Sequence, residues 1–295
     1  MKNVNLNFVG KFPLAVPLSI LMVVASIFLF FSKGLKYGVD FTGGAEIQIT
    51  FEDTVKLGDL RAALNSSGFE SSQVTSFGEI ENHFLIKVSS SNEDLNTTTD
   101  KITAMLNESF ADKGPRVDKT DIVGPKAGEH LRVSGFQAMA WALLMIMIYI
   151  ALRFDYKYSP GAIVALVHDI LIIIGVFVIF DREFSLQVVG ALLAVIGYSV
   201  NDTVVVYDRV REQEEKSLGK SLKEQINIAL NETLTRTLLT SLTTFIVAVV
   251  MYLMGGSGIE NFFFVICLGV IIGTYSSIFV AAPTILLLDK MGKKA

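Results

Sequence analysis

The stretch Gly197-Tyr198-Ser199-Val200-Asn201-Asp202-Thr203-Val204-Val205-Val206-Tyr207-Asp208-Arg209-Val210-Arg211 decides the class of protein. It begins as the end of an apolar run from Phe184 and finishes as a charged helix. If the membrane boundary lies near Asp208, Asp202 is about six residues, or roughly 9 Å, inside the membrane. A carboxylate at the centre of a lone membrane helix costs about 2.5–3.5 kcal/mol. Two interpretations stay open: a proton or ion site facing a bundle interior, or a carboxylate near a helix end that reaches headgroups or caps a neighbour.

The composition around this stretch predicts a polytopic membrane protein. Of the 295 residues, 51% are hydrophobic, and the mean hydropathy is +0.52, too high for an ordinary soluble domain. The net charge of −4 is mild and indicates no nucleic-acid partner. The single cysteine, Cys267, lies in an apolar run and cannot form an intrachain disulfide or a cysteine-based metal cluster. We expect no metal site and no organic cofactor.

Six apolar runs predict six membrane-spanning helices. They cover Phe12–Phe31, Val133–Leu152, Pro160–Phe180, Phe184–Tyr207, Leu238–Met254 and Asn261–Leu288. The first is interpreted as an anchor rather than a cleaved signal peptide, because no small-x-small cleavage site follows it. Lys and Arg gather in the segments on one side, whereas the short turns on the other side hold only Arg182. By the positive-inside rule, both termini are expected in the cytosol.

Between the first two runs the chain is polar, and its pattern predicts a separate domain. The predicted order is strand Gly44–Phe51, helix Lys56–Leu64, strands Gln73–Phe77 and His83–Val88, helix Glu93–Phe110 and strand Arg116–Val123. That βαββαβ order is typical of a ferredoxin-like α+β domain. The predicted fold class is therefore a polytopic α-helical membrane protein with one extracytoplasmic α+β domain between helices 1 and 2. The predicted domains are 1–33, 34–130 and 131–295, the last with a cytosolic loop at about 208–236.

Arg236 is predicted to open the fifth helix. Thr240, Thr243 and Thr244 follow on the same helical face, and such a row of hydroxyls beside a guanidinium suits a hydrated proton path. The alternative is an arginine that snorkels to the interface, with threonines that bond to carbonyls one turn back. Both interpretations stay open on this feature alone.

His168 and Asp169 lie some eight residues, or about 12 Å, inside the third helix. Two adjacent ionisable groups at that depth are costly unless they are paired or solvated. Because neighbouring helical positions point about 100° apart, one of the two is expected to face a partner helix. The pair is a second proton-transfer candidate, and a structural hydrogen bond is the alternative.

Two rows of small residues predict close helix packing. They are Gly190, Ala194, Gly197 and Asn201 on the fourth helix, and Gly269, Gly273, Ser277 and Ala281 on the sixth. A third glycine-rich segment, Gly38 to Gly44, lies between the first helix and the first strand. We interpret it as a rigid hinge through Gly38, Asp40, Phe41, Gly43 and Gly44, since no helix N-terminus is expected after it to hold a phosphate.

These segments, in this order, resemble the SecF family, the smaller membrane subunits of the bacterial SecD–SecF protein-export complex. The resemblance covers nearly the whole chain. The matching segments are G-V-D-F-T-G-G at 38–44, V-G-P-K-A-G-E-H-L-R at 123–132, H-D at 168–169, the opening stretch at 197–211, R-T-L-L-T-S-L-T-T at 236–244 and G-V-I-I-G-T-Y-S-S-I-F-V-A-A-P at 269–283.

The resemblance implies a multi-pass protein of the bacterial inner membrane that uses the proton-motive force in late steps of preprotein export. It implies Asp202 as the proton-carrying carboxylate and Arg236 as its basic counterpart, with protons as the coupling ion. It also implies SecD as the partner that supplies six further helices. The SecYEG translocon, YajC, the preprotein and the lipid bilayer are the other implied partners.

The sequence is less typical of two rival functions. A small-molecule or lipid exporter of the resistance-nodulation-division type usually needs larger outer domains on a 12-helix frame. An intramembrane aspartyl protease would need Asp169 and Asp202 close enough to share a proton. The chain lacks the Gly-x-Gly-Asp type of context expected of that class, and we expect no enzymatic activity.

Overall fold

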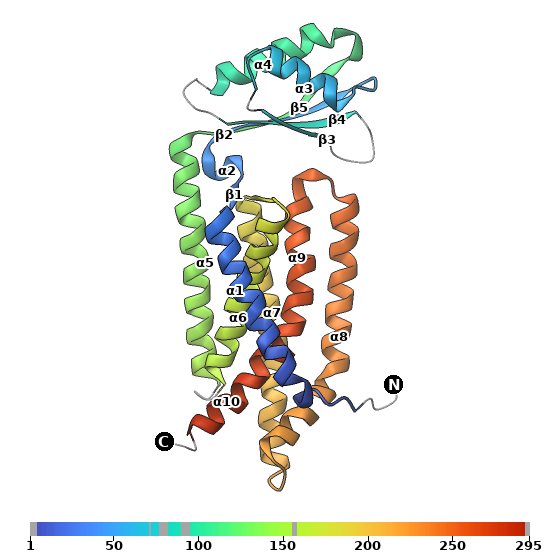
Figure 1. Cartoon of the computed structure of the whole chain (residues 1–295). Coiled ribbons are helices and arrows are strands. Elements are labelled where there is room, and N and C mark those ends of the chain that lie inside the picture. The colour runs from blue at the N-terminus through green and yellow to red at the C-terminus, as the bar shows by residue number, and fades with distance from the viewer. Residues whose placement is uncertain (1–4, 71, 77–81, 90–94, 155–157, 293–295) are drawn as a thin grey trace.

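The computed structural model describes residues 5–70, 72–76, 82–89, 95–154 and 158–292. A helical bundle carries a small sheet domain at one end, and both termini lie at the other end (Figure 1). We call these the domain end and the terminal end of the bundle. Six helices of the described chain are long and apolar enough to cross a membrane, which confirms the predicted fold class.

The six spans differ in length from the predicted apolar runs. They are α1 (Phe12–Lys33), α5 (Pro125–Arg153), α6 (Ser159–Ile179), α7 (Leu186–Lys216), α8 (Leu222–Met254) and a last span built from three pieces. The three pieces are α9 (Ser257–Ser276), a π-helical turn (Ser277–Ala281) and α10 (Ala282–Gly292).

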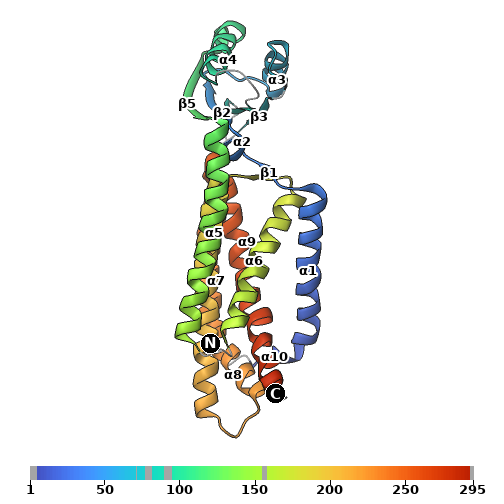
Figure 2. The same cartoon turned by 90° about the vertical axis from the view of Figure 1, so that its left-hand side faces the viewer.

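The sheet domain has the predicted ferredoxin-like arrangement. Its antiparallel strands lie in the order β3-β4-β2-β5, with β2 (Gly44–Phe51) at the centre. The other strands are β3 (Gln73–Ser76), β4 (His83–Ser89) and β5 (Pro115–Val123). Helices α3 (Leu57–Ser66) and α4 (Leu95–Ser109) cover one face of this sheet (Figures 1 and 2). Alternate residues of β2, among them Ile47 and Ile49, are fully buried against these helices, as the period-2 pattern predicts.

The segment Gly38–Gly44 contains a short helix that the sequence interpretation missed. Val39–Thr42 form α2, and Gly43 ends it with a φ of +78°, which favours glycine. A Cβ at Gly43 would lie 2.7 Å from the Cα of Pro125, so the first turn of α5 leaves no room for a side chain. The segment is therefore a tightly packed joint between the domain and α5.

The same joint is hydrogen-bonded to the start of α7 and to the residues just before it. The N–H of Leu186 donates to Asp40 Oδ2 at 3.1 Å, and the N–H of Gly38 donates to the carbonyl of Phe184 at 3.0 Å. The buried ring of Phe41 packs against the ring of Phe184, with centroids 6.1 Å apart. Strand β1 (Lys36–Tyr37) pairs with β6 (Glu183–Phe184) beside them.

A lysine of the sheet domain also bonds to the bundle. Lys87 on β4 forms ion pairs with Glu183, at the start of β6, and with Glu46 on β2. Burial lowers the pKa of Lys87, but the bonds to Glu183 and Glu46 outweigh that effect and raise the pKa overall. The domain is thus held by charge as well as by the joint.

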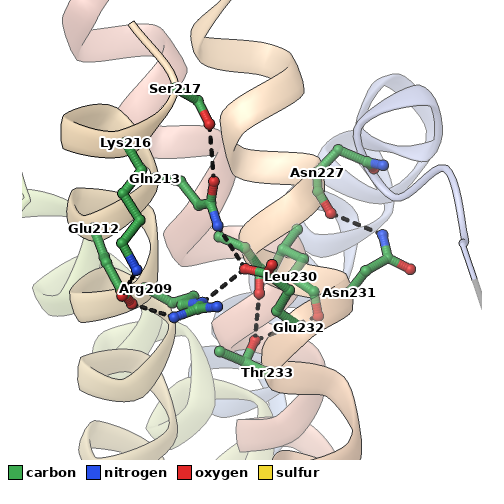
Figure 3. Close-up of polar contacts among 11 residues, drawn as sticks. Arg209, Glu212, Gln213, Lys216, Ser217, Asn227, Leu230, Asn231, Glu232 and Thr233 are labelled. Carbon is green, nitrogen blue, oxygen red and sulfur yellow. Dashed lines mark hydrogen bonds and ion pairs between the residues drawn. The ribbon is translucent and has the colours of Figure 1, made fainter. Parts of the chain in front are cut away.

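The segment at about 208–236, which we expected to be a loop, is a helical hairpin instead. Helix α7 continues to Lys216, and α8 begins at Leu222 with a capping box between Ser221 and Glu224. Figure 3 shows how the two arms are joined, since Glu232 on α8 accepts from both Arg209 and Gln213 on α7, each at 2.7 Å. Arg236 therefore lies deep within α8 and does not open the helix.

Candidate functional site: buried polar side chains in the bundle

Asp202 lies on the buried face of α7. Its side chain is 2% exposed, and its Oδ2 has no hydrogen-bond partner among the described residues. Thr237 on α8 is also 2% exposed, and within the same described part its hydroxyl is unpartnered too. Two unsatisfied buried oxygens are unusual, because buried polar groups are almost always hydrogen-bonded.

The register of the α7–α8 hairpin brings these two side chains to the same level. The hydroxyl of Tyr198 on α7 donates to Ser241 Oγ on α8 at 2.9 Å, and Ser241 bonds to Thr274 on α9 at 2.7 Å. The two helices run antiparallel. Asp202 lies one turn after Tyr198 and Thr237 one turn before Ser241, so both lie one turn closer to the terminal end.

Arg236 is next to Thr237, but its side chain is exposed in the isolated chain. Its charge acts on the Asp202 carboxylate, although no direct ion pair joins the two in the described structure. Asp202 and Arg236, the pair predicted from the sequence, therefore lie in the same region of the bundle but do not form an ion pair. An exposed guanidinium within a membrane span needs a further covering group.

Asp169 is the centre of a second polar cluster, at the meeting point of α6, α7 and α9. Its Oδ1 bonds to Nδ1 of the adjacent His168 at 2.9 Å. Its Oδ2 accepts from Ser199 Oγ at 2.6 Å and from Ser276 Oγ at 2.8 Å. Asp169 is 1% exposed, and its hydrogen bonds all come from protein donors. Its carboxylate is therefore satisfied, in contrast to that of Asp202.

His168 extends the Asp169 cluster toward α1. The imidazole stacks on the ring of Tyr275, whose hydroxyl bonds to Ser19 Oγ at 2.9 Å and to the carbonyl of Ala15 at 3.1 Å. The His168 Nε2 atom is buried and has no partner in the part of the chain that the structure describes. Polar groups therefore run from α1 through α9 and α6 to α7.

The threonine row on α8 bonds to its own helix. Thr240 Oγ1 donates to the carbonyls of Arg236 and Thr237, and Thr243 Oγ1 donates to those of Leu239 and Thr240. Both threonines are exposed in the isolated chain. For Thr240 and Thr243, these contacts match the backbone-bonding interpretation.

The two rows of small residues have different surroundings. On α9, a Cβ at Gly273 would lie 3.1 Å from Ser199 Cβ, and one at Gly269 would overlap the side chain of Val195. This row packs against α7. On α7, a Cβ at Gly190 or Gly197 would meet nothing within 4 Å. We call Gly190, Ala194, Gly197 and Asn201 the open face of α7, since all four are exposed.

Several polar residues of the site were missed from the sequence. They are Tyr198, Ser199, Thr237, Ser241, Tyr275 and Ser276. A helical-face argument could have found Tyr198, because it lies one turn before Asp202. Ser276 is 107 positions from Asp169 and needs the packed structure. In the described ranges, no group of three or more His, Cys, Asp or Glu residues could hold a metal ion.

The fold and the site together define a class: a polytopic helical membrane protein with ionisable side chains inside its bundle and one α+β domain after its first span. Two family models narrow that class. The model described as protein export membrane protein SecD/SecF, C-terminal, matches residues 102–291, and the SecD/SecF GG motif matches residues 28–55. The chain belongs to the SecD/SecF family of protein export membrane proteins.

Relatives of known name agree with this family. The protein translocase subunit SecF of Magnetococcus marinus is 40% identical over 293 residues, covering 98% of this chain and 94% of the relative. The subunit of the same name from Pseudomonas aeruginosa is 36% identical over 285 residues, covering 97% of this chain and 92% of that one.

A solved structure shares the fold. The crystal structure of SecDF from Thermus thermophilus, described as a translocon-associated membrane protein, superimposes with a TM-score of 0.84 at 31% identity. The match covers 97% of this chain and 39% of the SecDF chain. The chain therefore spans well under half the length of that protein.

Proposed function

We propose that this chain acts in the bacterial Sec machinery and couples the proton-motive force to late steps of preprotein export. The carrying observation is the buried Asp202 carboxyl, one oxygen of which has no hydrogen-bond partner among the residues that the structure describes. A protonated acid is tolerated at such a position, whereas a carboxylate needs a partner. Protons are the proposed coupling ion, and no organic cofactor and no enzymatic step are required.

A single proton supplies only a modest driving force. Its transfer across the membrane is worth about 2.3 kcal/mol per 100 mV. That amount can bias a bistable helix packing but cannot move a polypeptide at once, so repeated cycles are required. Arg236 is the proposed counter-charge for ionised Asp202. His168 and Asp169 form the second proposed proton-transfer group. The hydrogen bonds from Ser199 and Ser276 to Asp169 fix the position of its carboxylate.

The proposed orientation has both termini in the cytosol and the sheet domain outside the inner membrane. The support is the excess of Lys and Arg at the terminal end of the bundle. SecD is the proposed partner for the open face of α7 and for the exposed Arg236, since lipid solvates a guanidinium poorly. The SecYEG translocon, YajC and the preprotein are proposed as further partners from the family resemblance.

The test compares Asp202→Asn with wild type in membrane vesicles, by measuring preprotein translocation and release with and without a proton gradient. Asn keeps the size and removes titration, so the complex should assemble while gradient stimulation is lost and ATP-driven translocation continues. Asp208→Asn is the matched control, because Asp208 lies on the same helix but is exposed. Equal gradient stimulation of wild type and Asp202→Asn would refute the assignment.

A further inference from the structure

A long apolar groove runs between α1, α6 and the last span. It encloses about 830 Å³, within the range of about 300–1,000 Å³ typical of small-molecule sites. Its wall on the first span is one helical face from Val9, three residues before α1, to Val24, about 22 Å long at 1.5 Å per residue. Several side chains of its wall stay exposed, among them Ile20 at 59% and Leu287 at 59%.

The groove is preformed, because α1 is fixed on both sides of it. At the terminal end, Asn231 and Asn227 accept from the backbone N–H groups of Leu6 at 2.7 Å and Phe8 at 2.8 Å. Toward the domain end, Ser26 on α1 packs directly against Gly175 on α6. The helices therefore cannot collapse onto each other along the whole length of the groove.

The depth of the groove fits one lipid leaflet. One leaflet with its headgroup region is about 20–22 Å thick, and the groove extends about 22 Å from the terminal end to a level near the middle of α1. The close contact between Ser26 and Gly175 shuts it beyond that level. A membrane-spanning partner helix would need about 30 Å of continuous groove. An acyl chain that enters from one leaflet does not.

The charge of the groove lies at one end. Lys223, in the first turn of α8, and Lys290, in the last turn of α10, are the two cationic residues that line it. Both are exposed, and neither has an ion pair within the described chain. Glu224, beside Lys223, is engaged in the capping box with Ser221. A phosphate at headgroup level could therefore bind the ammonium groups of Lys223 and Lys290 at the end of the apolar groove.

We propose that this groove binds an anionic glycerophospholipid of the leaflet at the terminal end, with an acyl chain along α1 and the phosphate between Lys223 and Lys290. The lipid covers apolar surface that would otherwise be filled by loosely ordered chains. It also links α1, α8 and the last span. This site is separate from Asp202, and although His168 lies on its wall, lipid binding there does not depend on the proposed proton coupling.

The test uses tryptophan quenching by brominated lipids in vesicles that contain the full-length chain. The one native tryptophan, Trp141, is 63% exposed on α5 and reports on bulk lipid. The groove reporter is Ile20→Trp in a Trp141→Phe background, and Val24→Trp is a second reporter at an exposed groove position. At equal mole fraction, brominated phosphatidylglycerol should quench the groove reporters more than brominated phosphatidylcholine, whereas Trp141 should show no preference.

Neutralising the lysines should remove the preference. Each lysine near the surface is worth a roughly fivefold change in relative association, or about 1 kcal/mol. The double change Lys223→Gln/Lys290→Gln should therefore lower the preference roughly 25-fold, while Arg211→Gln, an exposed charge of α7 outside the groove, should not. Equal quenching by both lipids, a preference that survives the double change, or a groove that neither lipid reaches would each overturn the proposal.

Discussion

The same substitution should have opposite effects on the two rows of small residues. In Gly269→Ala, the new methyl group overlaps the side chain of Val195, which is 2% exposed and has no free space to move into. Overpacking of this kind costs about 1–3 kcal/mol, partly offset by about 1 kcal/mol of helix propensity. In Gly197→Ala, the methyl group meets nothing within 4 Å, so only the propensity gain of about 0.5–1 kcal/mol remains.

The two variants should therefore differ by roughly 2 kcal/mol in the free energy of unfolding, or about 30-fold in the equilibrium constant. The assay is reversible unfolding of the isolated chain in mixed micelles, followed by circular dichroism. Position 197 should instead be the sensitive one for assembly with a partner. The bulkier Gly197→Leu should weaken association with a SecD-type partner, because its side chain fills the open face of α7. Equal stability of Gly269→Ala and Gly197→Ala would refute the packing assignment, and full assembly of Gly197→Leu would refute the interface.

Two further outcomes test the orientation and the docking of the sheet domain. The orientation is tested by single cysteines in a Cys267→Ser background. A cysteine that replaces exposed Ser66 on α3 should react with an impermeant thiol reagent in spheroplasts, and one that replaces exposed Leu218 in the α7–α8 turn should not. The reverse result would show that the orientation is opposite to the proposed one. Lys87→Met should lower the free energy of domain docking by roughly 1–2 kcal/mol, because Glu46 loses its ion-pair partner and Glu183 keeps only Lys36. Since the pKa of Lys87 is raised, its ion pairs with Glu46 and Glu183 should persist through neutral pH and weaken only above the ordinary lysine pKa of about 10.4. Limited proteolysis across a pH series measures the docking of the domain. Loss of docking near pH 8 would contradict a raised pKa of Lys87.

The architecture was largely predictable, because hydropathy and period-2 alternation report directly on burial. The helical hairpin that contains Arg209 and Glu232 was not predicted, because its many charged residues favoured a loop. Its buried apolar positions, Ile226, Ala229 and Leu230, follow a helical spacing that was not recognised in the sequence. Its signals were nevertheless present: Arg211 and Glu215 form an i,i+4 pair, and Ser221-x-x-Glu224 is a capping-box pattern.

The candidate site was predictable only in part. Asp202, Asp169 and His168 were identified because ionisable residues inside apolar runs are costly. Which of the two carboxylates is satisfied could not be predicted, because Ser199 and Ser276 reach Asp169 through the packing of three helices. A single sequence gives the face of each helix but not its rotation against its neighbours.

The joint at Gly38–Gly44 makes α7 a lever. Asp40 holds the backbone of Leu186, the first residue of α7, and Asp202 lies 16 positions further along the same unbroken helix, about 24 Å away. A tilt of about 5° around Asp202 would displace the Leu186 end by about 2 Å. That displacement is comparable to the helix shifts of about 1–2 Å that accompany switching in other proteins. Part of a force on the sheet domain is therefore delivered to α7, whose buried Asp202 carboxyl has an oxygen without a partner in the described structure.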